Sequence, residues 1–236
     1  MFVAIINHGL VEQTLELKRR ISMYSPTEAI DSGSELTPAQ SAGFDVCLPN
    51  VYYSGLINAV ALRTAALSPD QPVLIWCSDV TCDALGRLFG LLESSFDDPT
   101  VGSYAPSAWY SYFKHMHRGR KERVRPVTFV DGFCFATRVR FLRQLCPIDT
   151  TLNMRGWGLE VHLGYLVQRA GMKTVIDDRI QVAHPPSTGY STTTAADERR
   201  NWVEHLPQGA RVFHRLANHR FGRASLGMKA LLRIAW

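Results

Sequence analysis

The sequence lacks the features that mark several large classes of protein. No apolar run approaches the roughly 18 residues that a membrane-spanning helix needs, and no internal repeat or low-complexity segment occurs. The five cysteines are odd in number and have no CxxC spacing, which argues against a disulfide framework or a zinc ribbon and favours a reducing compartment. No basic stretch precedes the apolar residues 2–6, so we expect no signal peptide and a cytoplasmic protein.

Net charge is absent from most of the chain. The whole sequence carries +5, and residues 201–236 account for all of it, with six Arg or Lys side chains against Glu204. The high isoelectric point therefore describes a tail rather than the main body. Because no pattern of a nucleic-acid-binding module accompanies this charge, we expect no nucleic-acid partner.

Strand and helix patterns alternate through the first hundred residues, and 236 residues are enough for one substantial core. Short apolar runs of buried-strand length alternate with segments whose apolar residues recur at helical spacing. Strands are expected at 2–6, 28–30, 44–48 and 73–76, and helices at 10–21, 54–67 and 85–92. This order predicts an α/β fold with a mainly parallel sheet flanked by helices.

The second half is less regular. Residues 114–126 form a basic connection, and its length and charge are typical of a mobile surface loop. Further strands are expected at 127–130, 133–137, 174–176 and 180–183, and a helix at 159–170. The last strand leads to His184.

Two acidic residues directly follow expected strands. Asp31 and Asp79 each come after an apolar run in the first half. Ligands of open parallel sheets bind outside the carboxyl ends of the strands, so this edge is the expected place for a site.

Several segments, taken in order, resemble the family 2 class of glycosyltransferases, which is built on the GT-A fold. The resemblance covers roughly residues 2–190. It rests on Asp31-Ser32-Gly33-Ser34, Asn50 with Tyr53-Ser54-Gly55 and Asn58-Ala59, Leu74 to Val80, Val130-Asp131-Gly132, Gly156 to Leu163, and Val182-Ala183-His184. It implies a single GT-A-type domain over 1–200, with a nucleotide-sugar half at 1–105 and an acceptor or catalytic half at 127–190, followed by a basic amphipathic extension at 201–236.

The resemblance also implies a donor site for a nucleotide-diphosphate sugar. Its residues would be Asp31, Ser34, Asn58, Ser78 and Asp79. Asp31 has an alternative explanation as an Asx-turn residue, and Asp79 as the cap of the following helix.

A divalent cation, Mn²⁺ or Mg²⁺, would bridge the diphosphate, with Asp79 and His184 as its ligands. Cys77 replaces the first acid of the family's Asp-x-Asp, and a neutral thiol is a poor ligand for a hard cation. His184 has the alternative of a structural histidine at a strand end.

The resemblance makes Glu160 the general base that deprotonates the acceptor hydroxyl for inverting transfer, at a position where the family usually has Asp. A carboxylate in a first helical turn is also favourable simply through the helix dipole, which lowers its pKa, so a working base requires burial. The acceptor would be a glycan or a lipid-linked saccharide. Its site would comprise Asp131, Gly132, Trp157 and Gly158, with Trp157 either stacking on a sugar or anchoring its loop.

Three questions stay open on the sequence: whether the protein catalyses transfer, what the basic loop contacts, and where the tail packs. The departure at Cys77 leaves a catalytically degenerate binding module as an alternative. A nucleotidyltransferase is disfavoured because no glycine-rich phosphate loop with a nearby lysine occurs. The basic loop 114–126 suits either contact with the diphosphate or plain solvation, and the tail 201–236 suits either an anionic membrane surface or packing on the protein itself.

Overall fold

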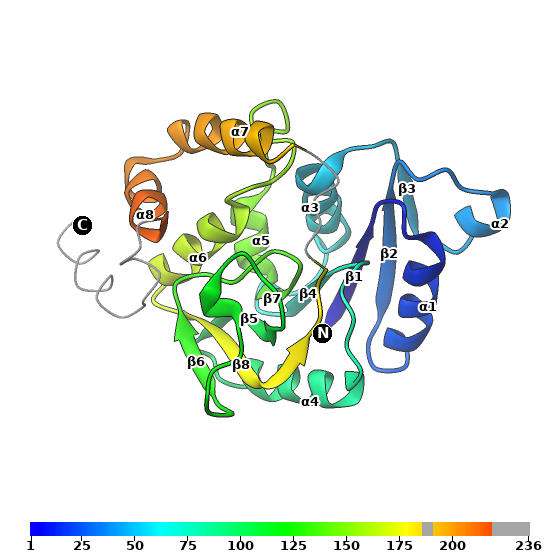
Figure 1. Cartoon of the computed structure of the whole chain (residues 1–236), viewed down its shortest axis with the longest axis horizontal. Coiled ribbons are helices and arrows are strands. Elements are labelled where there is room, and N and C mark those ends of the chain that lie inside the picture. Colours follow the sequence, from blue (N-terminus) through cyan, green and yellow to red (C-terminus); the bar gives the residue numbers. More distant parts are fainter. Residues whose placement is uncertain (186–190, 219–236) are drawn as a thin grey trace.

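The computed structural model describes residues 1–185 and 191–218 (Figure 1). Its strands are β1 (Phe2–Asn7), β2 (Thr27–Ser32), β3 (Val46–Leu48), β4 (Pro72–Cys77), β5 (Val101–Ala108), β6 (Val124–Val127), β7 (Cys134–Arg138) and β8 (Lys173–Val182). Its helices are α1 (Val11–Ile21), α2 (Pro38–Ser41), α3 (Tyr52–Arg63), α4 (Leu85–Phe96), α5 (Val139–Leu145), α6 (Leu159–Arg169), α7 (Thr192–Glu204) and α8 (Gln208–Asn218), with a 3₁₀ turn η1 (Lys114–Met116).

The strands of the described residues form one mixed sheet in the order β3-β2-β1-β4-β7-β5-β8-β6. The pairs β1–β2, β2–β3, β1–β4 and β5–β8 are parallel, whereas β4–β7, β5–β7 and β6–β8 are antiparallel. The expected α/β class with a mostly parallel sheet flanked by helices is confirmed.

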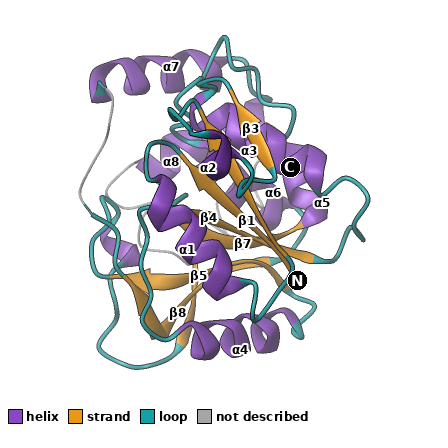
Figure 2. Ribbon diagram, turned by 90° about the vertical axis from the view of Figure 1, so that its right-hand side faces the viewer, coloured by secondary structure: helices purple, strands orange, loops and turns teal. Residues whose placement is uncertain are grey.

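Helices cover both faces of this sheet, as Figure 2 shows. On one face the ring of Tyr24, just after α1, stacks on Phe89 of α4 with centroids 5.3 Å apart. On the other face α5 contacts both α3 and α6. A sheet covered on both faces needs strands that are apolar along their whole length, and Val3 to Ile6 of β1 are all buried.

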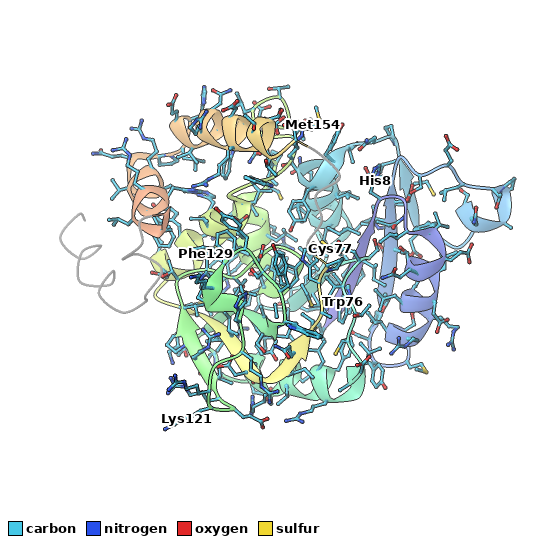
Figure 3. All side chains as sticks on the ribbon, viewed as in Figure 1. His8, Trp76, Cys77, Lys121, Phe129 and Met154 are labelled. Atoms are coloured by element: carbon cyan, nitrogen blue, oxygen red, sulfur yellow. The ribbon has the colours of Figure 1, made fainter. Side chains whose placement is uncertain are left out.

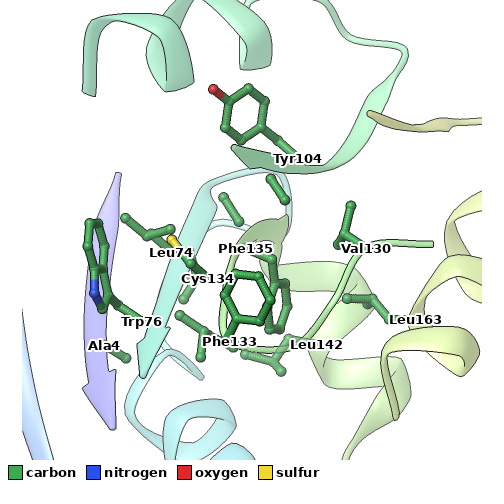
Figure 4. Close-up of a cluster of buried hydrophobic side chains, with 14 of the residues drawn as sticks. Ala4, Leu74, Trp76, Tyr104, Val130, Phe133, Cys134, Phe135, Leu142 and Leu163 are labelled. Atoms are coloured by element: carbon green, nitrogen blue, oxygen red, sulfur yellow. The ribbon is translucent and has the colours of Figure 1, made fainter. Parts of the chain in front are cut away.

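The core lies between the middle of the sheet and these helices. Figure 4 shows Leu74 of β4 beside Cys134 of β7, with Trp76 at one margin of the cluster, and Phe135 of β7 on the side toward Leu163 of α6. Trp76 is fully buried, and its indole nitrogen donates to the carbonyl of Val80, 3.0 Å away. The indole therefore holds the turn that follows β4 in place.

The register brings the carboxyl ends of three strands to one edge. Asn7 of β1 lies beside Asp31 of β2, and Ile6 lies beside Cys77 of β4. The antiparallel β7 begins at the same edge, since Cys134 pairs with Trp76. Residues just before β7 and just after β4 are consequently neighbours, although they are more than fifty positions apart in the sequence.

The second half differs from the sequence-based expectation in several elements. β5, which was not expected, is fully buried in the sheet, and α5 was not expected either. The two short strands at 174–176 and 180–183 are one strand, β8, with an irregular register opposite Pro106 and Ser107. The strand placed at 127–130 is β6, which lies at 124–127 and pairs with β8. The basic connection therefore contains both η1 and part of a paired strand.

The described part of the tail packs on the protein itself. Phe213 and Ala210 of α8 are buried, and α8 contacts α6. The expected boundary at residue 200 falls inside α7. The apolar and basic residues of the tail beyond 218, which the membrane-surface hypothesis needs, lie outside the described residues. No helix of the described part of the chain combines the length and apolar character that a bilayer crossing requires.

Candidate active site

The site lies at the sheet edge where β1, β2 and β4 end and β7 begins. Asp79 follows β4, Asp131 and Gly132 precede β7, and His184 follows β8. Asp79 and His184 are more than a hundred positions apart in the sequence, and the mixed topology brings all these residues to one place. This is the edge at which ligands bind in open α/β sheets.

Asp79 and His184 form a close pair. Nε2 of His184 lies 3.3 Å from Oδ2 of Asp79. A backbone bridge between Thr81 and Ala183 holds their two segments together, with both N–H···O distances at 2.9 Å. The His184 ring is also stacked on Phe133, with centroids 4.4 Å apart, so its orientation is set by the core.

The residues present fit a divalent cation in one respect. Oδ1 of Asp79 is buried and has no hydrogen-bond partner in the described part of the chain, and such an atom is costly unless a ligand satisfies it. An aspartate oxygen beside an imidazole nitrogen is a donor pair that Mn²⁺ accepts. No group of three or more His, Cys, Asp or Glu that could hold a metal ion occurs among residues 1–185 and 191–218, so the bound substrate would have to complete the coordination.

Cys77 does not supply a second anionic ligand beside Asp79. Burial, with the nearby charge of Asp79, raises the pKa of the Cys77 thiol well above its usual value. The thiol is therefore neutral, and its sulfur lies 3.9 Å from the carbonyl oxygen of Gly132, within reach of a weak hydrogen bond. Its position fits a packing role better than a metal-ligand role.

Asp131 is held in one orientation. Its Oδ2 accepts a hydrogen bond from the Ser111 hydroxyl at 2.6 Å, and its Oδ1 accepts one from the backbone N–H of Gly132 at 2.9 Å. Burial raises the pKa of Asp131, whereas these two hydrogen bonds and the charge of His184 act in the opposite direction. Gly132 is fixed in turn by the Tyr53 hydroxyl, which donates to its carbonyl oxygen at 2.6 Å.

Glu160 lies in the first turn of α6, close enough to Asp131 for their charges to interact. Burial and the charge of Asp131 raise the pKa of Glu160 from 4.5 to about 7, against the smaller lowering by the start of the helix and by Arg199. One Glu160 oxygen accepts from the backbone N–H of Gly158 at 3.1 Å. The side chain is only half-buried. A carboxylate with these properties is suited to take up a proton near neutral pH.

The segment before α6 needs its two glycines. Gly156 and Gly158 have φ of +75° and +92°, a region that side chains with a Cβ rarely adopt. A Cβ on Gly156 would come within 2.5 Å of Cδ1 of Tyr53. Trp157, between them, is half-buried. This segment is covered by α7, because Arg155 forms an ion pair with Glu198, and the Arg199 side chain lies against Gly158.

Asp31 and Ser34 form the turn that follows β2. Asp31 is 1% exposed, and its Oδ1 accepts from both Asn7 (2.7 Å) and the Ser34 hydroxyl (2.5 Å). Its Oδ2 accepts from the backbone N–H of Ser34 at 3.0 Å. The carboxylate therefore serves the turn itself, as in the Asx-turn explanation, and the rim of this turn, rather than Asp31 alone, is what a ligand would meet.

The other two expected donor residues also have structural contacts. The side-chain amide of Asn58 exchanges two hydrogen bonds with the backbone of Ile148, at 2.9 and 2.7 Å. Ser78 is buried, and its carbonyl oxygen accepts from the Gln13 side chain at 2.7 Å. The structure thus brings together Asp79, His184, Asp131, Gly132 and Glu160, and ties Asn58 to the loop that follows α5.

Three contributors to the site were missed on the sequence. Ser111 orients Asp131, Asn7 orients Asp31, and Arg199 lies beside Gly158 and Glu160. Asn7 directly follows an apolar run, and this position could have identified it. Ser111 and Arg199 carry no local signal, because β5 was not recognised and α7 reaches the site only through the tertiary fold.

Only the start of the basic loop reaches this edge, where the Asp131 backbone N–H lies 3.3 Å from the sulfur of the buried Met116. Figure 3 places Lys121 at the lower margin of the molecule, whereas Cys77 lies near its centre. Residues Gly119, Arg120, Lys121, Arg123, Arg125 and Asp178 line a separate hollow of about 240 Å³. The loop tip therefore has no contact with the candidate site in this conformation.

Known structures share this architecture at low sequence identity. GalNAc-T7 with UDP, GalNAc and Mn²⁺ superposes with a TM-score of 0.59 and 14% identity over 89% of this chain and 48% of that chain. The mannosyltransferase PcManGT from Pyrobaculum calidifontis, in complex with GDP-Man and Mn²⁺, superposes with a TM-score of 0.55 and 15% identity, covering 99% of this chain and 79% of that one. The chain spans about half the length of the first of these proteins.

No protein-family model and no curated protein matches the sequence. The structural likeness therefore establishes the fold alone. This chain has a GT-A-like fold in a single domain, as the resemblance implied.

Proposed function

We propose that this protein is an inverting glycosyltransferase that uses a nucleotide-diphosphate sugar. The observation that carries the proposal is the convergence, at one sheet edge, of the Asp79–His184 pair and of a carboxylate, Glu160, with a pKa of about 7. Two proteins of the same fold bind UDP with GalNAc and GDP-Man, each with Mn²⁺, which supports this class of donor.

In this proposal Glu160 takes the proton from the acceptor hydroxyl. The acceptor oxygen then forms a bond to the anomeric carbon of the sugar, and the bond from that carbon to the diphosphate oxygen breaks. The nucleoside diphosphate leaves with the electron pair. Asp131, held by Ser111 and Gly132, keeps the Glu160 pKa high until the proton arrives.

Asp79 and His184 would hold the cation, and the turn at Asp31 and Ser34, with Ser78, would line the donor side. A bound Mn²⁺ or Mg²⁺ supplies positive charge to the departing diphosphate. Gly132, Trp157 and Gly158 would face the acceptor, which we take to be a glycan or lipid-linked saccharide. Asn58 would act only through the loop that it fixes.

The test is nucleotide binding followed by transfer. A thermal-shift panel of UDP, GDP, CDP and dTDP, with and without Mn²⁺, is expected to show stabilisation by one nucleotide that Mn²⁺ increases, since a ligand that binds only the folded state raises its stability. No stabilisation by any nucleotide would contradict the proposal.

A second candidate is a binding module with this fold that does not catalyse transfer. It is favoured by the neutral thiol at Cys77 and by the absence of a three-ligand metal cluster within the described ranges. The panel separates the two candidates when it is followed by a donor-hydrolysis assay. Binding without slow release of free sugar would support the module.

A further inference from the structure

Three aromatic side chains stand in solvent beside the candidate site. Trp109 and Tyr112 are each 77% exposed, and Tyr110 is 46% exposed. They belong to the segment Trp109–Tyr112, which directly follows β5 and which we call the aromatic strip. Large exposed aromatic groups on a soluble surface mark binding sites when they are gathered in one place.

The aromatic strip is anchored to the candidate site at two points. The Trp109 backbone N–H donates to the carbonyl oxygen of Val182, at the end of the strand that leads to His184, at 2.9 Å. The Ser111 hydroxyl donates to Asp131 at 2.6 Å, and Ser111 itself is buried. The backbone is thus fixed while the rings on either side of Ser111 point outward.

The layer beneath the strip is also ordered. The Phe113 ring packs edge-on against Phe129, with centroids 4.9 Å apart. The Ser111 carbonyl oxygen lies 3.1 Å from Nε2 of His117, and the Phe113 N–H donates to the Ser111 hydroxyl at 3.0 Å. The exposed rings therefore sit on a support that is already built, which lowers the entropic cost of binding a ligand.

We propose that the aromatic strip is a stacking platform for a saccharide acceptor of more than one sugar ring. The proposal rests on the function proposed above, because the strip leads to Asp131 and from there to Glu160, where the acceptor hydroxyl would be deprotonated. Flat rings suit the C–H faces of sugars, and the tyrosine hydroxyls suit their O–H groups. Trp109 and Tyr112 are three residues apart, a reach of up to about 11 Å, which exceeds a single ring.

The composition of the strip favours a saccharide over a lipid surface. It contains no aliphatic side chain, whereas segments that enter a membrane interface combine aromatic with aliphatic residues. One exposed cation, Lys114, lies two residues beyond the strip, whereas the tip of the basic loop at Lys121 lies at the lower margin of the molecule in Figure 3. A membrane-bound strip is an outcome that the experiment must separate.

The experiment compares the unmodified chain with two double variants on a glycan array of bacterial, plant and animal oligosaccharides. Trp109→Ala with Tyr112→Ala removes both faces, and Trp109→Phe with Tyr112→Phe keeps them. Leu62→Ala is the control, because Leu62 is 78% exposed on α3, outside the site. All three substituted positions are exposed, so thermal midpoints are expected to stay near that of the wild type.

The expected result is binding to oligosaccharides that the alanine pair weakens by about tenfold or more, while the phenylalanine pair and the Leu62 control retain it. Equal binding by the alanine pair would overturn the proposal, and so would binding to no glycan on the array. If the wild type binds phosphatidylglycerol vesicles but no glycan, and the alanine pair loses this vesicle binding, the strip would be assigned to a lipid surface instead.

The nucleotide panel keeps this result separate from the proposed function. Nucleotide binding without glycan binding would remove only the stacking platform. Glycan binding that depends on the strip, without nucleotide binding, would keep the platform and remove the glycosyltransferase.

Discussion

At the scale of single residues, the decisive feature is the environment of Glu160. A carboxylate at the start of a helix ordinarily has a lowered pKa, but burial and Asp131 raise this one to about 7. The base must be ionised to accept a proton, so we expect the transfer rate to rise with pH through about 7 and to level off above it. A pH–rate profile of kcat checks this. Glu93→Gln, at an exposed position of α4, is the matched control and should leave the profile unchanged.

Removing the carboxylate should separate binding from transfer. Glu160→Gln is expected to keep donor binding and to slow transfer by roughly 10²- to 10⁴-fold, the usual contribution of a general base. Single-turnover transfer and the nucleotide thermal shift measure the two effects. Transfer at the wild-type rate would show that another group is the base.

The same substitution should stabilise the ligand-free protein at alkaline pH. The folded-state pKa of Glu160 is raised above its ordinary 4.5, so between these values the folded state binds the extra proton. Stability is therefore lost as the pH rises through the folded pKa. At pH 8 we expect Glu160→Gln to have a higher unfolding midpoint than the wild type, and at pH 4 about the same one. A lower midpoint at pH 8 would contradict the environment assigned to Glu160.

The two proposed cation ligands, Asp79 and His184, have a separate test. Asp79→Asn and His184→Ala are each expected to reduce the part of the nucleotide thermal shift that depends on Mn²⁺, while the shift without metal changes little. The expectation follows from the unpartnered Oδ1 of Asp79 and from the contact between the two side chains. An unchanged Mn²⁺ dependence in both variants would exclude this pair as ligands.

At the scale of elements, the turn into α6 limits what the sequence can vary. Gly158→Ala places a side chain at φ +92° and is expected to cost about 1–2 kcal/mol of unfolding free energy. Gly156→Ala should cost more, because its Cβ would also meet the Tyr53 ring at 2.5 Å. Urea unfolding measures the change.

Gly90→Ala is the control for these two substitutions. Gly90 lies on an exposed face of α4 with nothing within 4 Å of a Cβ. There alanine should stabilise the protein by about 0.5–1 kcal/mol. Equal effects at all three positions would contradict the backbone argument.

At the scale of the whole molecule, α7 and α8 are joined to α6 through a buried pair of histidines. His162 of α6 and His214 of α8 stack with ring centroids 6.0 Å apart, and both meet the Trp202 ring of α7 edge-on. Burial lowers the pKa of His162 to about 4. Burial, with the charges of His162 and Arg199, lowers that of His214 to about 3.

This pair predicts an acid-sensitive packing of the last two helices. Below the ordinary histidine pKa of 6.5 these two histidines bind protons in the unfolded chain but stay neutral in the folded one. The free energy of unfolding therefore falls as the pH drops from about 6.5 towards 4. His214→Phe should flatten this fall in a series of thermal melts. His205→Ala, at an exposed position, should leave it unchanged, and a flattening by both variants would contradict the assignment.

Much of the fold could be predicted because local sequence patterns determine it. β1, β4, α1 and α4 follow from apolar runs and helical spacing, and their observed bounds differ little from the expected ones. β5 was missed because Gly102, Pro106 and four Ser or Ala residues weaken its strand propensity. It is a strand because β7 and β8 pair with it along both of its edges.

The features of the candidate site likewise fall into those that local sequence patterns predict and those that only the tertiary structure shows. By itself the sequence determined the α/β class and the kinds of side chain that follow the strands at the candidate edge, because these depend on periodicity and on the order of the elements. Only the tertiary structure decided that His184 reaches Asp79, that Asp131 raises the pKa of Glu160, and that the Asp31 carboxylate hydrogen-bonds within its own turn. Distances and burial between residues a hundred positions apart arise from the mixed sheet, and no local pattern encodes them.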